Sequence, residues 1–197
     1  MVTPRLAELH VHLEGTVRRG TALDLARRHG VRPPPPYRYR DLAGFLEVYG
    51  AVNRCLRDGA DFERVVLEHA GRMAEESIAY AELSFNPSLH AGESWLPGIE
   101  SGRRLAQDSF NVEIAWIVEL SRTAPLKANE QALEIAFRTE GVVGVGLVGD
   151  ESVAAAPLRS LFESARARGL AASFRATWSW RLGCLGAGLR PPPSGRS

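Results

Sequence analysis

Two histidines near the amino terminus carry the clearest chemical signal in the sequence. In Glu8-Leu-His-Val-His-Leu-Glu-Gly, one residue separates His10 from His12, and alternate residues of a β-strand project to the same side. Their imidazoles could therefore bind one metal ion at the carboxyl end of a strand, and Glu14 has the same parity. Imidazole nitrogen suits zinc, although a catalytic zinc needs about three protein ligands and a water. From spacing alone, the alternative is two solvent-facing or hydrogen-bonded histidines on an edge strand.

The surrounding chain alternates between strand and helix patterns. Alternating apolar residues place Leu9, Val11 and Leu13 on one face of a first strand, and further strands are expected at residues 80–85, 112–120 and 142–148. Helices are expected at about residues 21–29, from an N-cap at Asp41, from near Asp61, and at about 97–110, 128–139 and 157–168. Because the later strands are β-branched and mostly apolar, a parallel α/β fold is predicted. Periodicity alone leaves open a doubly wound sheet or part of a (β/α)₈ barrel, which typically needs about 250 residues.

Composition excludes several classes of protein. The chain has 197 residues, 45% hydrophobic and 24% charged, with a net charge of +1, so no general attraction to nucleic acid or to a membrane surface is expected. The amino terminus lacks an apolar signal core, and no apolar stretch approaches the roughly 18 residues of a membrane span. With only Cys55 and Cys184, a cytoplasmic protein without a disulfide framework is predicted.

The carboxyl-terminal segment differs in composition from the rest. The 34 residues after Glu163 contain six arginines and no Asp or Glu, and the chain ends in a run rich in Pro, Gly, Ser and Arg. Such a composition favours disorder. We therefore expect one domain over residues 1–170 and a divergent, disordered tail over 171–197.

At this point the sequence resembles the adenosine deaminase-like family of metal-dependent amidohydrolases. The first strand of that family carries His-x-His-Leu-(Asp/Glu)-Gly, which the segment His10 to Gly15 matches. Similar segments follow in the family's order: Asp41-Leu-Ala-Gly-Phe-Leu, Asp61-Phe-Glu-Arg, Ala79-Tyr-Ala-Glu-Leu-Ser-Phe-Asn-Pro and Val142-Val-Gly-Val-Gly-Leu-Val-Gly-Asp-Glu. The resemblance covers about residues 5–170.

The resemblance implies a partial TIM (β/α)₈ barrel containing the first four to five βα units. It also implies a hydrolase that uses Zn²⁺ to convert adenosine or adenine to inosine or hypoxanthine, with release of ammonia. Carried over by position, His10 and His12 would be metal ligands, while His12, Glu14 and Gly149 would lie at the purine substrate. The family has Asp or Glu at position 14, which leaves base and nucleoside substrates both open.

The second half of the family's site is missing from the pattern. A fifth strand with His-Ala-Gly-Glu, which would supply a third ligand and the catalytic Glu, is due after Gly169, but the chain reads Leu170-Ala-Ala-Ser-Phe-Arg. No catalytic residue is therefore assigned, and the favoured hypothesis is an amino-terminal half, truncated or frameshifted near residues 170–175. The first alternative is a non-catalytic half-barrel remnant or binding protein. The second is a small metallohydrolase whose site consists of His10, His12, His90 and Glu93. The segment His90-Ala-Gly-Glu93 matches the fifth-strand motif but occurs too early in the chain, and we interpret it as an incidental loop sequence.

The remaining candidates receive structural interpretations. We expect His29 to meet the last carbonyls of its helix, His69 to be packed or on the surface, and Cys55 to act as a small hydrophobe. Glu82 could point inward from its strand. Gly144, Gly146 and Gly149 lack the spacing of a phosphate-binding loop and indicate close backbone approach.

Overall fold

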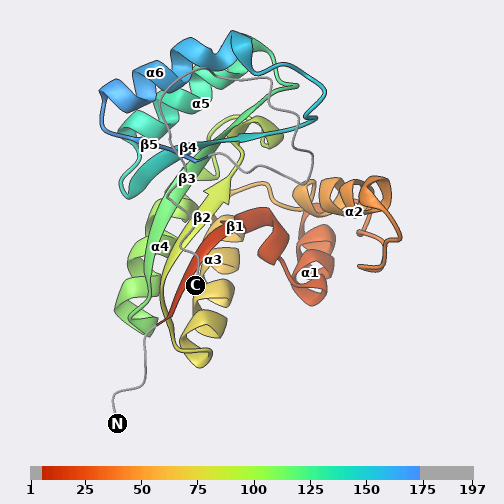
Figure 1. The fold of residues 1–197 in the computed structure, drawn as a ribbon. Coiled ribbons are helices and arrows are strands. Elements are labelled where there is room, and N and C mark those ends of the chain that lie inside the picture. The colour runs from red at the N-terminus through yellow and green to blue at the C-terminus, as the bar shows by residue number, and fades with distance from the viewer. Residues whose placement is uncertain (1–5, 174–197) are drawn as a thin grey trace, which may run out of the picture.

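A single parallel sheet organises the protein, and the computed structural model describes residues 6–173 (Figure 1). These residues form five strands that pair in parallel in the order β1-β2-β3-β4-β5. The strands are β1 Leu6–His12, β2 Ile78–Phe85, β3 Glu113–Ser121, β4 Val142–Val148 and β5 Ala171–Ser173. Each strand lies beside the one before it in the sequence, without the reversal of order that defines a doubly wound sheet. The order is therefore that of a barrel, as the resemblance implied.

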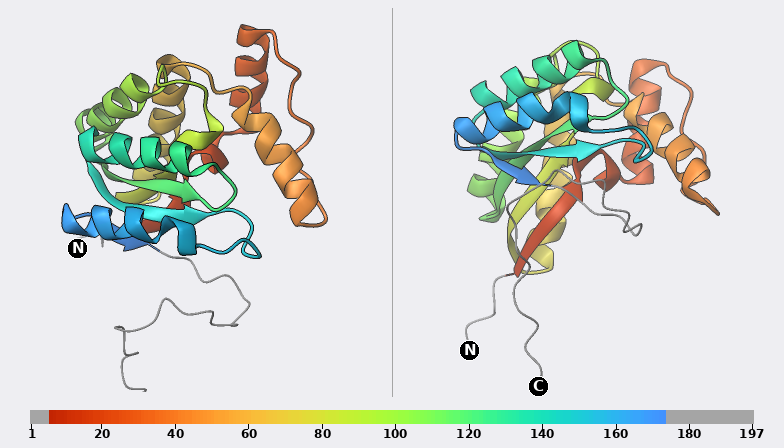
Figure 2. Two further views of the ribbon diagram at one scale, coloured as in Figure 1. Left: turned by 90° about the horizontal axis from the view of Figure 1, so that it is seen from above. Right: turned by 45° about the horizontal axis from the view of Figure 1, so that its top comes forward.

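Within residues 6–173, six α-helices accompany the sheet. They are α1 Arg19–His29, α2 Leu42–Asn53, α3 Gly59–Glu75, α4 Leu96–Phe110, α5 Leu126–Arg138 and α6 Arg159–Ala167, with short 3₁₀ turns at Leu13–Thr16, Pro87–Leu89 and Ala156–Leu158. The helices α3 to α6 each precede a strand and cover one face of the sheet, which we call the outer face (Figure 2). In contrast, α1 and α2 stand beside the carboxyl end of β1 (Figure 1). None of the described helices combines the length and apolar composition needed to cross a membrane.

The starts of two helices follow from capping residues. The side chain of Asp41 accepts a hydrogen bond from the Gly44 N–H at 2.8 Å, which confirms the predicted N-cap of α2. Helix α3 begins slightly earlier than expected, because Asp58 is its N-cap and Asp61 is the third residue of a reciprocal capping box. His29 Nε2 lies 2.7 Å from Asp61 Oδ2, so this histidine joins the end of α1 to the start of α3, a partner the helix-end prediction did not include.

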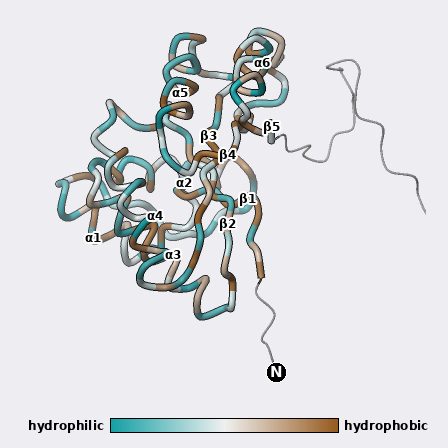
Figure 3. Tube along the Cα trace, turned by 90° about the vertical axis from the view of Figure 1, so that its left-hand side faces the viewer, coloured by the Kyte–Doolittle hydropathy of each residue, from teal (hydrophilic) through white to brown (hydrophobic). Residues whose placement is uncertain are grey.

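The core lies between the outer face of the sheet and its helices. Trp116 and Val118 of β3 and Leu83 and Phe85 of β2 are fully buried there, and β3 and β4 are coloured largely hydrophobic in the middle of the molecule (Figure 3). The alternate residues face the opposite side, which we call the inner face. On β2 and β3 the inner face includes Tyr80, Glu82, Ser84, Ala115, Ile117, Glu119 and Ser121.

The predicted tail begins inside the sheet. Ala171–Ser173 pair with Gly144–Gly146 of β4, which supplies the strand expected after α6. A Cβ on Gly144 would lie 2.9 Å from the Ala171 carbonyl oxygen, so the predicted close approach at this glycine is confirmed. Residues 174–197, to which the rest of the disorder prediction and Cys184 belong, lie outside the described part of the chain.

Candidate functional site

The first strand is not the regular alternating strand that the sequence predicted. Leu9 pairs with Glu82 whereas Val11 pairs with Leu83, and His10 has a φ of +70°. One extra residue is therefore inserted at His10, as in a β-bulge. The bulge reverses the parity of the strand from that point on.

Side-chain contacts show the effect of this bulge. Glu8 reaches His69 of α3 on the outer face, whereas His12 contacts Glu119 on the inner face. Glu8 and His12, which a regular strand would place on the same face, therefore lie on opposite faces of the sheet. The prediction of one apolar face is wrong, since Leu9 is 60% exposed while Val11 packs against the core.

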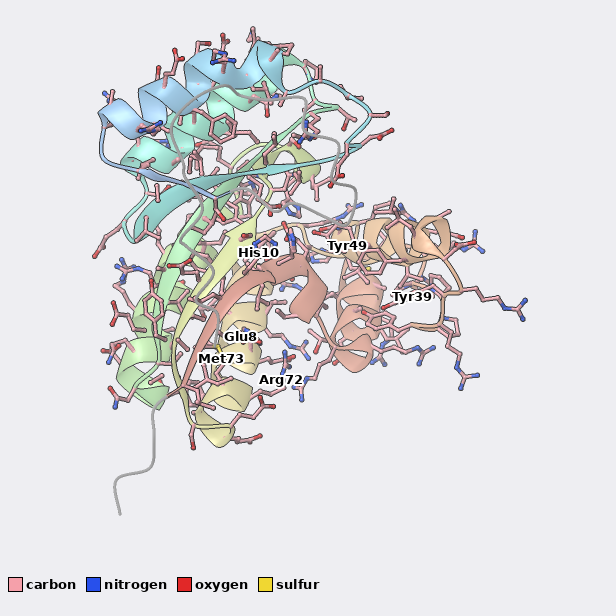
Figure 4. All side chains as sticks on the ribbon, viewed as in Figure 1. Glu8, His10, Tyr39, Tyr49, Arg72 and Met73 are labelled. Atoms are coloured by element: carbon pink, nitrogen blue, oxygen red, sulfur yellow. The ribbon has the colours of Figure 1, made fainter. Side chains whose placement is uncertain are left out.

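The two histidines nevertheless lie together at the carboxyl end of β1. Their ring centroids are 5.2 Å apart in an edge-to-face arrangement, and His10 projects beside this end of the sheet (Figure 4). The predicted proximity is therefore present, although the strand is bulged at His10 and does not alternate regularly there. Two imidazoles side by side can supply two of the ligands that a zinc ion takes.

A polar row crosses the inner face from His12. Nδ1 of His12 lies 3.0 Å from Oε1 of Glu119, and the Ser84 hydroxyl donates a hydrogen bond to the same carboxylate. The Glu119 side chain is only 3% exposed. Burial raises the pKa of Glu119, and the charge of Glu14 raises it further, while the hydrogen bonds from His12 and Ser84 oppose the rise.

Glu14 lies two residues after the end of β1, in the 3₁₀ turn Leu13–Thr16, and its side chain is buried. Its Oε1 accepts hydrogen bonds from the Asn86 N–H at 3.1 Å and from His90 Nε2 at 3.3 Å. Its Oε2 accepts one from the Tyr49 hydroxyl at 3.2 Å. Burial alone would raise the pKa of Glu14, but the hydrogen bond and charge of His90 and the Asn86 N–H hold that pKa below its usual range. Glu14 is therefore an ionised carboxylate within a closed set of donors.

Tyr49 connects this buried carboxylate to the surface of α2. Burial and the charges of Glu14 and Glu119 raise the pKa of Tyr49, so its hydroxyl stays protonated and donates to Glu14. Its ring stacks on Phe45 at 5.7 Å, and Phe45 meets Tyr39 edge to face at 5.2 Å. Tyr39 is 54% exposed. The contacts of these three rings therefore connect exposed Tyr39 to the hydroxyl that Tyr49 donates to Glu14, and both tyrosines lie on the α2 side of the molecule (Figure 4).

His90 and Glu93 separate in the structure. The His90 ring packs edge to face against Phe62 at 4.8 Å and binds Glu14, with its Nδ1 buried and without a hydrogen-bond partner. Glu93 forms an ion pair with Arg138 at 2.6 Å on the surface. The structure therefore does not bring His90 and Glu93 together with the histidine pair of β1, and the rearranged metal site is wrong as a four-residue set.

Another group of three potential metal ligands within residues 6–173 has a structural role. The side-chain ligand atoms of His29, Asp58 and Asp61 lie within 4.8 Å of one another. However, Arg28 binds both carboxylates, and Asp61 also accepts from the Arg57 and Asp58 N–H groups. The cluster is the cap of α3 and the joint between α1 and α3.

The remaining predictions concern single residues. His69 is packed as predicted: its Nε2 lies 3.3 Å from Glu8 Oε2 without hydrogen-bond alignment, and burial together with the charge of Arg72 lowers its pKa to about 4. Cys55 is fully buried and behaves as the predicted small hydrophobe. Glu82 points inward and accepts a hydrogen bond from Tyr80 at 3.2 Å. Gly149 follows β4 with a φ of +99°, a conformation that favours glycine.

Three residues of the site were absent from the sequence prediction. Glu119 carried a usable signal, because it is a carboxylate that directly follows the apolar run 114–118. Asn86 follows a strand directly and precedes a proline, which marks a turn but no chemistry. Tyr49 lies at helical spacing with apolar neighbours, so its sequence position indicates only core packing.

Comparisons with known proteins agree with this geometry. The family model described as adenosine deaminase matches residues 4–177. An aminodeoxyfutalosine deaminase from Acidothermus cellulolyticus is 33% identical over 73% of this chain and 45% of its own length. An adenine deaminase from Bordetella parapertussis is 33% identical over 84% of this chain and 57% of its own length. An amidohydrolase from Burkholderia ambifaria, solved with bound Zn, superposes with a TM-score of 0.75 and 25% identity over 87% of this chain and 52% of that one. The chain thus spans about half the length of the curated relatives that it matches.

Proposed function

The chain belongs to the adenosine deaminase family, and from this premise we propose that it serves the zinc-dependent hydrolytic deamination of a purine. The single observation that carries the proposal is the contact of His10 and His12 at the carboxyl end of β1. In barrels of this kind the functional face is formed by the carboxyl ends of the strands. The buried Glu14 lies directly beyond the same strand end.

The donor set at this end of β1 fits zinc in part. His10 and His12 would hold the ion through imidazole nitrogens, the donor type common in hydrolytic zinc sites. When bound, zinc would lower the pKa of a water toward about 7 and so provide a nucleophile at neutral pH. Within residues 6–173, no third histidine or carboxylate completes a close set of ligands with this pair. Residues 1–5 and 174–197 contain no histidine, aspartate or glutamate, so we propose that the remaining ligands and the proton-transferring carboxylate are supplied from outside these 197 residues.

The other residues around the pair would hold the substrate. Gly149, at the carboxyl end of β4, presents backbone without a side chain, so a flat purine ring could approach it closely. Glu14 is ionised and fixed by three donors, of which Tyr49 comes from α2. We propose that this carboxylate and the rings of α2 border the end of the purine away from the reacting carbon. The substrate is an aminopurine, as a free base or as a nucleoside, in keeping with the two kinds of deaminase among the relatives.

Metal binding by the full chain is the first test. The purified, metal-free protein is titrated with zinc by isothermal calorimetry, alongside the double variant His10→Ala/His12→Ala. We expect one zinc per chain for the original protein and loss of this binding in the variant. The variant His69→Gln is the matched control, since that histidine is buried on the outer face. Circular dichroism verifies that every variant keeps its fold.

Ammonia release then tests the reaction itself. The zinc-loaded chain is incubated with adenine, adenosine and aminodeoxyfutalosine, and ammonia is measured by a coupled enzyme assay. Because the proton-transferring carboxylate is proposed to lie outside this chain, we expect ammonia that requires both zinc and the histidine pair, but at a low rate. Zinc bound without any ammonia would reject deamination by this chain and favour the non-catalytic half-barrel. Zinc retained by the double variant would reject the assignment of His10 and His12.

A further inference from the structure

Glu119 is buried beside His12, a proposed metal ligand. The sequence analysis assigned no role to this glutamate. We infer that Glu119 is a positioning residue that holds His12 in its Nδ1–H tautomer and fixes the direction in which the ring presents Nε2. This inference rests on the proposed function, because it gives His12 its role toward zinc. It concerns a residue to which the resemblance assigned no role.

The hydrogen-bond geometry carries the first step. His12 Nδ1 and Glu119 Oε1 are 3.0 Å apart, which is the distance of an N–H···O hydrogen bond. An imidazole that donates from Nδ1 has a lone pair on Nε2 and can bind a metal only there. A carboxylate that accepts from the non-ligating nitrogen of a histidine fixes both the tautomer and the ring orientation. Glu119 therefore provides the hydrogen-bond acceptor that fixes the tautomer and orientation of a metal-binding His12.

The strand arrangement explains why this contact is available to Glu119. His12 of β1 pairs with Ser84 of β2, and Ser84 pairs with Ile117 of β3, two residues before Glu119 on the same face. The Ser84 hydroxyl, between the two, also donates to the carboxylate. Glu119 thus has two fixed donors from two different strands.

On the β4 side, the neighbour of Glu119 is a glycine. Glu119 lies beside Gly146 in the register of β3 and β4. A Cβ on Gly146 would already touch Glu119 Cγ at 3.6 Å, so a longer side chain there would compete with the carboxylate.

A spectroscopic test examines the tautomer without any metal. The full chain is labelled with ¹⁵N-histidine, and long-range ¹H–¹⁵N correlation spectra at one fixed neutral pH identify the protonated nitrogen of His12, assigned with His12→Ala. We expect Nδ1–H in the original protein. In Glu119→Ala the Nε2–H form, which a free imidazole prefers, should become dominant. The matched control is Glu82→Ala, an inner-face glutamate bonded to Tyr80 instead of a histidine.

Zinc affinity gives the second readout. Glu119→Ala should weaken zinc binding by about 10- to 100-fold, and Glu119→Gln, which keeps the shape and an acceptor oxygen, should lie between the two. An Nε2–H tautomer in the original protein, or equal zinc affinity in Glu119→Ala, would overturn the assignment. If the original chain bound no zinc, the proposed function would fail, and the tautomer alone would then decide the role of Glu119. If the alanine variant did not fold, the glutamine variant would be measured in its place.

Discussion

The outer and inner faces of the sheet come from the same strands but differ in what they bury. Along β3, Trp116, Val118 and Leu120 point outward into a continuous apolar core. The alternate residues Glu119 and Ser121 point inward, where the Glu119 carboxylate contacts His12 and the Ser121 hydroxyl lies 3.2 Å from the Thr123 hydroxyl. Apolar burial is non-directional, whereas a buried carboxylate is tolerated only with suitably placed donors. We infer from this difference that the outer face mainly stabilises the fold, whereas the inner face carries the chemistry.

The largest effect that tests this division is expected from Trp116. Its side chain is fully buried on the outer face, so Trp116→Ala should lower the free energy of unfolding by about 3–5 kcal/mol through lost burial and a cavity. Leu9→Ala is the inner-face counterpart. Leu9 is 60% exposed, so its truncation should cost less than about 0.5 kcal/mol. Urea unfolding followed by circular dichroism measures both, and similar costs for the two variants would contradict the division.

Much of the outer face could be predicted from sequence because it follows periodicity. The strand at 142–148 has the bounds expected for it, and the other strands differ from prediction by one or two residues at most ends. Apolar spacing and capping residues such as Asp41 determine these elements locally. Local pattern thus suffices where packing against a helix is the only requirement.

The inner face could be predicted only in part. The proximity of His10 and His12 was predicted correctly, but the bulge was not, because no local sequence pattern indicates a left-handed, non-glycine residue at His10. The contact of His12 with Glu119 joins strands that are more than 100 residues apart and depends on the register of three strands. Likewise, Tyr49 reaches Glu14 from a helix whose spacing indicates only an apolar face. Such contacts are set by tertiary register, which one sequence does not display.

A buried histidine makes the outer face sensitive to acid. The pKa of His69 falls from 6.5 to about 4 through burial and the charge of Arg72. The folded state therefore stays unprotonated while the unfolded state takes up a proton as the pH falls below 6.5. The stability present above that pH should decrease, by up to about 3 kcal/mol at pH 4.

The variant His69→Gln isolates this contribution. Glu8 and Glu76 also lie on this side of α3. Burial raises the pKa of Glu8, so protonation of Glu8 adds stability as the pH falls and opposes the loss caused by His69. The informative quantity is therefore the difference between the two unfolding free energies, measured by urea titration from pH 7 to pH 4. That difference should shift steadily across the interval as the original protein loses stability. Parallel pH profiles would show that His69 keeps an ordinary pKa and that the outer face tolerates its charge.

The contact between α3 and α4 provides the smallest of the three effects. A Cβ on Gly98 would lie 1.8 Å from the Gly59 carbonyl oxygen, so the two helices meet through backbone at this point. Gly98→Ala should force them apart and cost about 1–3 kcal/mol, despite the better helix propensity of alanine. Gly20 in α1 is the matched control, because no atom lies within 4 Å of a Cβ built there. Gly20→Ala should stabilise the protein by up to about 1 kcal/mol. Thermal unfolding distinguishes the two signs, and a gain in both variants would mean that the outer helices adjust freely and do not set the position of the strands behind them.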